Sequence, residues 1–278
     1  MTRKRKPKQI RPLIDICIVV HGRFDLLTQC LDAVPDACGD IKYNLIIVDN
    51  ASPDEKEARE FYRAKAIEHP KGTVIRNYKN LGFPKANNQA AREGKAPLIF
   101  LLNSDVILEP GSVELLVKDM DDPKIGIVGM HLVFPEYAGG LNQQIRPAGK
   151  TQHVGMETSI NGRFNHIFVG WEPTHPKVIA MRETYAVTGA ALMTRRSIWK
   201  KTNGFDEVYG QGTYEDVDFC LQTREMGYNI IVNPVSMGVH YTGATAEQYR
   251  IGFPLENNRM IFLQKWQQNL TWTEWNRL

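Results

Sequence analysis

Short apolar runs alternate with segments of helical spacing along the first hundred residues of the chain. Four apolar runs predict buried strands, at 14–20, 45–48, 73–75 and 98–102. Apolar side chains at helical spacing over 26–34 predict a first helix, and Pro53 is expected at the first helical position of a second, charged helix that reaches about residue 68. A turn at 80–84 leads into a third helix that is rich in small residues. This order predicts an α/β domain with a mostly parallel sheet, right-handed crossovers and helices on both faces.

The second half of the chain is less regular. A helix after Pro110 and a strand at 125–128 precede a long segment, 134–183, that is rich in Gly, Pro, His, Gln and Asn. A segment of this kind inside a compact domain is commonly a binding loop or a hairpin, so we expect a small antiparallel or irregular region here. The later pattern predicts four elements, namely a strand at 186–193, a helix at 215–226, a strand at 229–232 and a final helix at 255–269.

The length and composition are those of one globular domain with a short tail. The chain has 278 residues, of which 42% are hydrophobic and 23% are charged. We expect a tail at 1–12 and a single domain at 13–278, made of a first part at 13–130, a second part at 131–250 and a C-terminal helix at 251–278. No apolar run reaches the ~20 residues that a membrane-spanning helix needs. The amino terminus lacks the apolar segment of a secretory signal, and the cysteines lack metal or redox spacing, so we expect a cytoplasmic protein with packed, reduced thiols.

Basic residues are concentrated in the tail. The net charge is +3, and six basic residues precede the first predicted strand, so the remainder of the chain carries −3. We expect the tail to be disordered, and two roles fit it: a solubilising leader, or an electrostatic attachment to anionic lipid that would make the protein peripheral at the membrane surface. Nucleic-acid binding is not expected, because no basic stripe continues into the domain.

One carboxylate follows a buried strand at a position where chemistry is expected. Asp105 comes directly after the apolar run 98–102 and the pair Asn103-Ser104. Open α/β sheets bind ligands at the carboxyl ends of their parallel strands, and a buried carboxylate without a partner is costly. A divalent cation that carries a diphosphate would be a suitable partner. An acidic cluster at 215–218 and His240, at the end of another apolar stretch, fit the same idea.

Several short motifs follow one another in a set order along the chain. They are Val48-Asp49-Asn50-Ala51-Ser52, Asn80-Leu81-Gly82-Phe83, Leu102-Asn103-Ser104-Asp105, Thr188-Gly189-Ala190, Gly204-Phe205-Asp206-Glu207, Glu215-Asp216-Val217-Asp218, Gly227-Tyr228 and His240-Tyr241. Each motif is weak alone, but their order over roughly residues 14 to 268 resembles the inverting family-2 glycosyltransferases of the GT-A fold, rhamnosyltransferase-like members above all. Those enzymes use nucleotide sugars.

The resemblance implies a metal site. Asp105 is similar to the second acid of the family's Asp-x-Asp motif, and Asn103, which replaces the first acid, is expected to contact ribose or a metal-bound water. His240 is similar to the family's late metal-ligand histidine. The alternatives are a helix cap before Pro110 for Asp105 and a satisfied core residue for His240. Carboxylate and imidazole ligands, together with diphosphate oxygens, suit Mn²⁺ or Mg²⁺.

The resemblance also implies a nucleotide-sugar site, mostly within 13–130. Asp49 would accept a hydrogen bond from the base, although an Asx turn or a helix cap before Pro53 explains it equally well. An equal alternative for His21 is a residue of a surface loop without a nucleotide contact. The alternative for Gly82 is a turn that requires glycine there. The residues assigned to the nucleotide sugar are Val20, His21, Asp49, Asn80, Gly82, Asn87, Asn103, Ser104 and Gly189.

The second part, 131–250, is expected to hold the acceptor and the catalytic carboxylates. We expect Asp216 to be the general base, Glu215 to orient the acceptor and Asp218 to serve the helix. The alternative for this cluster is stabilisation of the helix dipole, but crowded carboxylates also raise one another's pKa toward a value useful for accepting a proton. The segment 134–183 would build the acceptor site, with Trp171 either a sugar-stacking platform or a packed side chain.

The resemblance thus implies metal-dependent transfer of a hexosyl or deoxyhexosyl group from a UDP- or dTDP-sugar to a hydroxyl of a glycan or polysaccharide, with inversion. A nucleotidyltransferase is the first alternative, but it would need a glycine-rich loop with a downstream basic residue after the first strand, and His21-Gly22-Arg23-Phe24 fits poorly. The second alternative is a non-catalytic glycan- or membrane-binding module, which has no use for a metal site and a base together.

Overall fold

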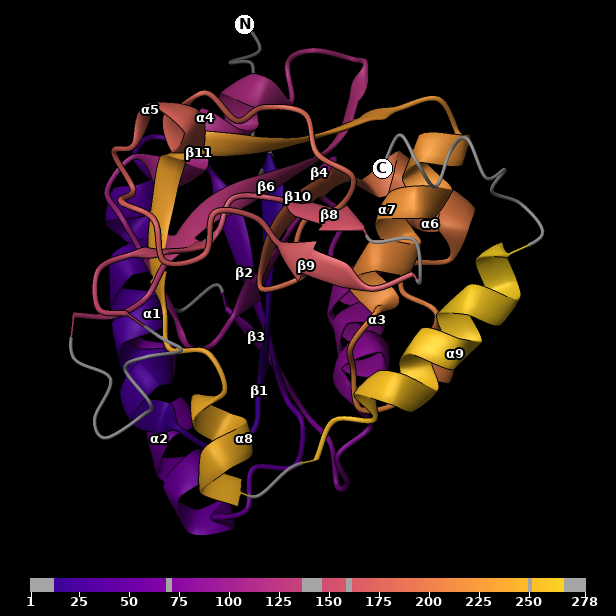
Figure 1. The fold of residues 1–278 in the computed structure, drawn as a ribbon. Helices are drawn as coiled ribbons and strands as arrows, with labels where there is room; N and C mark the ends of the chain where they lie inside the picture. Colours follow the sequence, from indigo (N-terminus) through magenta and orange to yellow (C-terminus); the bar gives the residue numbers. More distant parts are fainter. Residues whose placement is uncertain (1–12, 69–71, 137–146, 159–161, 250–251, 268–278) are drawn as a thin grey trace, which may run out of the picture.

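The protein is built around one large mixed sheet. The structure, a computed structural model, describes residues 13–68, 72–136, 147–158, 162–249 and 252–267. Within these ranges nine strands form the large sheet, in the order β3-β2-β1-β4-β10-β6-β11-β5, with β7 paired to β6 (Figure 1). The strands of this sheet are β1 (Ile14–Val20), β2 (Tyr43–Asp49), β3 (Thr73–Arg76), β4 (Leu98–Asn103), β5 (Val106–Leu108), β6 (Ile125–Val133), β7 (Thr151–His153), β10 (Ala191–Arg195) and β11 (Asn229–His240).

Parallel pairing prevails in the first part of the sheet and antiparallel pairing enters later. β3, β2, β1 and β4 are mutually parallel, as the strand–helix alternation predicted. β10 runs antiparallel to both β4 and β6, and β5 is antiparallel to β11, while β6 and β11 are parallel. A separate hairpin is formed by β8 (Met156–Thr158) and β9 (Phe164–His166).

Helices cover both faces of the large sheet. The helices are α1 (Phe24–Cys38), α2 (Glu55–Glu68), α3 (Phe83–Glu93), α4 (Ser112–Asp119), α5 (Pro176–Ile179), α6 (Arg196–Thr202), α7 (Glu215–Glu225), α8 (Ala244–Tyr249) and α9 (Leu255–Trp266), with a 3₁₀ turn η1 (Glu207–Tyr209). One apolar core joins α1, α2 and α4 to one sheet face, and a second joins α3, α6, α7 and α9 to the other. β1 shows the division, because Ile16 and Ile18 belong to the first core and Cys17 to the second. This alternation is the period of two that a sheet buried on both faces requires.

The predicted elements are present, with three corrections. The helix expected to start at Pro53 begins at Glu55, because the side chain of Asp54 accepts the N–H of Glu57 and caps it. The strand expected at 186–193 spans only Ala191–Arg195, because Gly189 donates its N–H to a side chain of α7 and not to a neighbouring strand. The strand expected at 229–232 continues to His240 past a register shift between Asn233 and Met237.

The segment expected to be irregular, 134–183, contains β7 and the β8–β9 hairpin among its described residues. The expected tail at 1–12 and the last residues of the expected final helix lie outside the described residues. All four cysteines are buried and unpaired, as expected.

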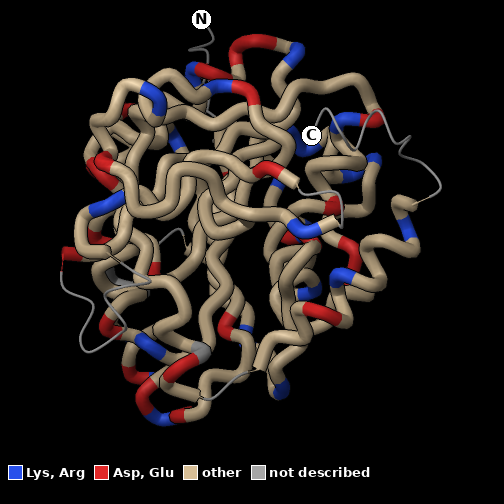
Figure 2. Tube along the Cα trace, in the orientation of Figure 1, with Lys and Arg blue, Asp and Glu red and all other residues tan. Residues whose placement is uncertain are grey.

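Charges of both signs are spread around the outside of the molecule (Figure 2). In the described ranges we find no helix with the length and apolar character needed to cross a bilayer. The carboxyl ends of β1, β2, β4 and β11 lie near the amino end of β10 and the start of α7, and the candidate site forms there.

Candidate active site

A cavity of about 380 Å³ opens where these strand ends meet. Nine of the residues assigned from the sequence line it, namely His21, Asn80, Asn103, Ser104, Asp105, Gly189, Glu215, Asp216 and His240. They come from six separate segments of the chain, which the fold brings together. The volume suits a ligand of the size of a small cofactor or substrate.

Asp105 and His240 face each other in this cavity. Asp105 lies in the tight link between β4 and β5, and the antiparallel β5–β11 pair brings His240 opposite Val106. Nε2 of His240 lies 3.4 Å from Oδ1 of Asp105, and both side chains are about nine-tenths buried. Two ligands on neighbouring positions of a small divalent ion are separated by roughly 3 Å, so this spacing fits shared ligation. Within the described ranges no cluster of three or more His, Cys, Asp or Glu side chains has the geometry of a metal site.

Gln152 contacts the other ring nitrogen of His240, and sequence reasoning did not identify this residue. Oε1 of Gln152 lies 2.8 Å from Nδ1 of His240, and the Gln152 amide also donates to the Thr242 hydroxyl. With the Gln152 amide in this orientation its Oε1 accepts, so Nδ1 carries the proton, and the Thr242 hydroxyl lies 3.2 Å from the same nitrogen. The Nε2 lone pair is therefore free and directed at Asp105, which is the tautomer that a metal ligand needs.

An asparagine network shapes the other end of the cavity. Nδ2 of Asn50 donates to Oδ1 of Asn80 at 2.9 Å, and Oδ1 of Asn50 accepts the N–H of Leu81 at 2.9 Å. Nδ1 of His21 lies 3.0 Å from the Asn50 carbonyl. These bonds fix the loops after β1, β2 and β3 relative to one another, so Asn50 belongs to the site although only its motif was recognised in the sequence.

Four assigned residues lie behind the cavity wall. Val20 is buried in β1 beside the lining residue Val19. The Asp49 carboxylate is fully buried, where Oδ1 accepts the Ser52 N–H at 2.8 Å and Oδ2 pairs with Arg76 at 2.7 Å. Asp49 therefore stabilises the loop after β2 through a side-chain bond three residues on and an ion pair, and its contact with a base stays a prediction.

Gly82 and Asn87 also support the wall from behind. Gly82 has φ +84°, and a Cβ there would come within 1.9 Å of the Gly210 carbonyl oxygen, so two loops meet at a position that only glycine fits. The amide of Asn87 is buried on α3 and donates to the Phe83 carbonyl at 2.9 Å.

Glu215 and Asp216 enter the cavity from the start of α7. Oδ2 of Asp216 accepts the Gly189 N–H at 2.9 Å, and Oδ1 accepts the Val217 N–H at 2.8 Å. The Thr188 side chain is a further hydrogen-bond partner of this carboxylate. Glu215 is 4% exposed, and its Oε2 has no hydrogen-bond partner among the described residues.

The pKa values of both carboxyls lie above their ordinary range. Burial raises the pKa of Asp216, while hydrogen bonds from Gly189 and Val217 hold it down. Burial raises the pKa of Glu215 well above its usual value, and the nearby Asp216 adds to the effect. Burial is thus the largest cause for both carboxyls, and the crowding of carboxylates predicted from the sequence adds to it at Glu215.

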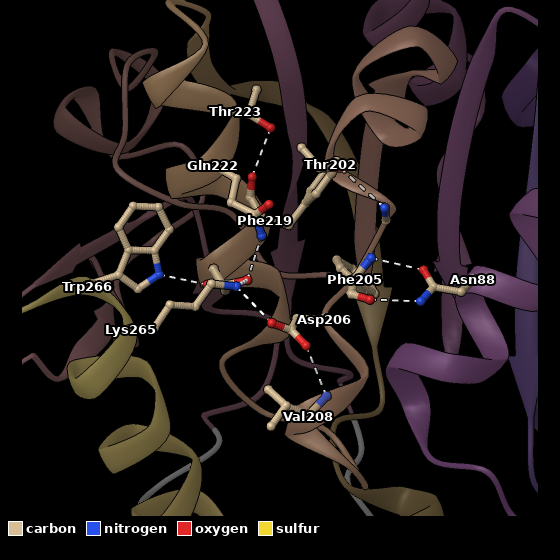
Figure 3. A network of polar contacts seen from close by, with 12 residues as sticks. Asn88, Thr202, Phe205, Asp206, Val208, Phe219, Gln222, Thr223, Lys265 and Trp266 are labelled. Carbon is tan, nitrogen blue, oxygen red and sulfur yellow. Dashed lines mark hydrogen bonds and ion pairs between the residues drawn. The ribbon is translucent and has the colours of Figure 1, made fainter. Parts of the chain in front are cut away.

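Asp218 is outside the cavity lining and joins α7 to α9 through Trp266 and Lys265, which Figure 3 shows. Its Oδ1 accepts the Trp266 indole N–H at 2.7 Å, and its Oδ2 accepts from Lys265 at 2.8 Å and from Gln222 at 2.7 Å. Lys265 also pairs with Asp206 at 2.8 Å. Asp218 therefore anchors α9 to α7, a structural role broader than the helix-local one expected.

Other lining residues were not singled out from the sequence. Thr242, Thr245 and Phe253 line the cavity, and single residues of this kind in loops and short helices give little signal on their own. Trp171 is outside the lining, where its half-exposed ring contacts Phe168 and His175 at centroid distances of 4.9 and 4.6 Å.

Solved structures with the same fold are glycosyltransferases. GalNAc-T7 with UDP, GalNAc and Mn²⁺ superposes with a TM-score of 0.65 at 13% identity, over 84% of this chain and 44% of that one. The mannosyltransferase PcManGT from Pyrobaculum calidifontis, with GDP-Man and Mn²⁺, gives 0.58 at 17% identity, over 91% of this chain and 68% of that one. The fold is therefore that of the GT-A glycosyltransferases, as the sequence predicted.

The sequence comparison supplies the family. Residues 15–201 match the family described as Glycosyl transferase family 2, so the chain belongs to this family. It is 25% identical over 251 residues to the O-antigen biosynthesis protein RfbC of Myxococcus xanthus, a match that covers 87% of this chain. This chain spans 18% of the length of RfbC and 25% of a related Sinorhizobium fredii protein. Family membership favours glycosyl transfer over the nucleotidyltransferase and the non-catalytic module.

Proposed function

We propose that this domain transfers a glycosyl group from a nucleoside diphosphate sugar to a hydroxyl of a glycan and inverts the anomeric centre. The single observation that carries the proposal is one cavity that holds both the Asp105–His240 pair and the Asp216–Glu215 pair. The first pair suits a cation on a diphosphate, and the second suits proton removal from an alcohol. The O-antigen role in the name of RfbC supports a polysaccharide acceptor.

Asp105 and His240 would hold the divalent cation, Mn²⁺ or Mg²⁺. The spacing of their ligand atoms and the tautomer set by Gln152 support this role. When bound, the cation would stabilise negative charge on the departing diphosphate. Asn103 and Ser104, beside Asp105 in the cavity lining, are placed for the ribose or the phosphates.

Asp216 would act as the general base. Its carboxylate takes the proton of the acceptor hydroxyl while the acceptor oxygen forms its bond to the anomeric carbon. The bond between that carbon and the diphosphate oxygen breaks on the opposite face, and the nucleoside diphosphate leaves with the electron pair. The bonds from Gly189 and Val217 hold the carboxylate in place, so its orientation does not depend on the acceptor.

Glu215 would orient the acceptor by hydrogen bonding. Its free Oε2 and its raised pKa favour a neutral carboxyl, which can donate to a sugar oxygen as well as accept from a hydroxyl. Asp216 and Glu215 then have different protonation states, as adjacent acid and base groups require.

The nucleotide would lie toward His21, Asn50 and Asn80, and Gly189 would face the sugar. We expect a UDP- or dTDP-sugar, with Asp49 near the base. We also propose that the basic tail attaches the domain electrostatically to an anionic membrane surface.

The test is a binding screen followed by transfer. Nucleoside diphosphates and nucleotide sugars are titrated by calorimetry with Mn²⁺ and with EDTA, and the donor that binds is then offered to glycan acceptors. Metal-dependent binding and release of a product with inverted anomeric configuration are expected. Binding that is the same in EDTA, or release of a nucleotidyl product, would refute the proposal.

A further inference from the structure

A buried asparagine of the C-terminal helix contacts the turn that precedes the catalytic carboxylates. Asn258 of α9 is 1% exposed. Its Nδ2 lies 2.9 Å from the Tyr209 carbonyl, 2.7 Å from the Gly212 carbonyl, 3.1 Å from the Thr213 carbonyl and 3.2 Å from the Thr213 hydroxyl. Four oxygens around one nitrogen fix the amide orientation, because the flipped amide would place its oxygen against all of them.

The turn held in this way is strained. Gly210, Gly212, Thr213 and Tyr214 all have positive φ, at 59°, 124°, 80° and 71°. Thr213 is β-branched and Tyr214 is bulky, and both residue types strongly disfavour this region of the backbone. Such a conformation persists only where surrounding contacts over-determine it.

The strained turn leads directly into Glu215 and Asp216. Gln211, Gly212 and Thr213 themselves line the cavity, and the Thr213 N–H hydrogen-bonds the Glu215 carboxylate. On its far side the turn meets the loop at Gly82 through the close approach of the Gly210 carbonyl. The position of this turn therefore decides where the two carboxyl groups point.

The far end of α9 is attached separately. Trp266 and Lys265 bond to Asp218 within α7, and Lys265 reaches back to Asp206 beside η1 (Figure 3). α9 thus has two attachments, one to the strained turn through Asn258 and one to the body of α7 through Trp266. The second attachment can be cut without touching the first, which supplies a matched control.

We propose that Asn258 is a positioning residue, which holds the strained turn Gly210–Tyr214 in the conformation that presents Glu215 and Asp216 to the cavity. This role rests on the proposed function, because the turn matters for transfer only if Glu215 and Asp216 act in it. It implies that the C-terminal helix belongs to the catalytic apparatus although α9 supplies no lining residue among those described. Loss of Asn258 should impair transfer more than it impairs donor binding, since the metal pair lies on other elements.

The experiment compares Asn258→Ala and Asn258→Asp with Trp266→Phe in the full chain. Asn258→Ala should lower kcat by roughly 10- to 100-fold, a common cost of small misplacement, while the Kd of the nucleoside diphosphate with Mn²⁺ stays within about 3-fold. Asn258→Asp, which sets a carboxylate against the same oxygens, should lower kcat further at neutral pH. Trp266→Phe should reduce the melting temperature but keep kcat within about 2-fold, because it cuts only the attachment to Asp218.

Hydrogen exchange supplies a readout that needs no substrate. Amides of the turn should exchange faster in Asn258→Ala than in the parent, and at the parental rate in Trp266→Phe. Unchanged exchange at the turn, or a kcat loss in Trp266→Phe equal to that in Asn258→Ala, would overturn the role of Asn258. A parent protein that binds no nucleotide sugar would instead refute the proposed function, while the exchange result would still decide whether Asn258 holds the turn.

Discussion

Nε2 of His240 faces Oδ1 of Asp105 across 3.4 Å, although the two residues come from distant parts of the chain. The β5–β11 pair fixes this relationship, and the Tyr241 N–H reinforces it by donating to the Asp105 carbonyl at 2.9 Å. Backbone hydrogen bonds thus position both candidate ligands. A site of this kind needs little reorganisation to bind a cation.

Removal of either ligand should weaken metal-dependent binding. Asp105→Ala should abolish transfer and weaken nucleoside diphosphate binding only when metal is present. His240→Ala should raise the Mn²⁺ concentration needed for half-maximal rate without unfolding the domain. Mn²⁺ titrations followed by calorimetry and by rate provide the measurement. Metal-dependent activity of Asp105→Ala within a few-fold of the parent would exclude Asp105 as a metal ligand. An unchanged Mn²⁺ titration of His240→Ala would show that His240 has a structural role only.

Gln152 provides a finer test of the same site. Gln152→Ala leaves both ligands in place but removes the acceptor that holds the proton on Nδ1 of His240. Apparent Mn²⁺ affinity should fall roughly 10-fold or more, as is usual for such supporting residues. Mn²⁺ binding measured by electron paramagnetic resonance, in the presence of nucleoside diphosphate, is the readout. Parental affinity in this variant would show that the His240 tautomer is fixed by other groups.

Glu215 should destabilise the folded protein at neutral pH. The pKa of Glu215 is raised on folding, so the stabilisation from its proton is present below its unfolded pKa and is lost as pH rises through the folded value. Glu215→Gln cannot ionise and should therefore melt higher than the parent above that range, by roughly 2–4 °C per kcal/mol gained, with little difference near pH 4. Glu225→Gln, an exposed change on the same helix, is the control. Equal melting temperatures of Glu215→Gln and the parent at all pH values would show that ionisation of Glu215 does not lower the free energy of unfolding.

The basic tail should be dispensable for chemistry. Six basic residues and few apolar ones precede the first strand, so the tail has little to contribute to a core. Deletion of residues 1–11 should preserve the rate on a soluble acceptor and reduce sedimentation with anionic vesicles, with neutral vesicles as the control. A large loss of rate on the soluble acceptor would place the tail at the active site.

Strand ends were predictable from the sequence because the pattern there is local. The apolar run of β4 followed by Asp105, and the acidic start of α7, are each visible within ten residues. The contacts that support them are not local. Gln152 lies on a three-residue strand in a segment without periodicity, and Asn258 is a polar residue buried on a helix whose pattern suggested only an apolar face.

The bounds of two predicted strands were wrong because they depend on contacts with distant parts of the chain. The apolar residues at 186–190 look like strand, but Gly189 donates to Asp216 and so leaves the ladder. Pro234 interrupts the pattern of β11, and the strand continues beyond it through a register shift that only pairing with β6 defines. Such contacts depend on the assembled fold and leave no periodic trace.

The most direct test of the central claim is the behaviour of Asp216→Asn beside Asp218→Asn. Asp216→Asn keeps the shape of the side chain but cannot accept the proton, so donor affinity should stay near the parental value while transfer falls roughly 10²-fold or more. Burial raises the pKa of Asp216, so this base becomes protonated at a higher pH than an ordinary aspartate. As pH falls, the parental rate should therefore begin to decline at a pH above the usual pKa range of aspartate. Asp218→Asn should mainly lower the melting temperature, since it loosens the attachment of Trp266 and Lys265. Transfer by Asp216→Asn within a few-fold of the parent, measured alongside unchanged donor binding by calorimetry, would contradict the assignment of Asp216 as the base.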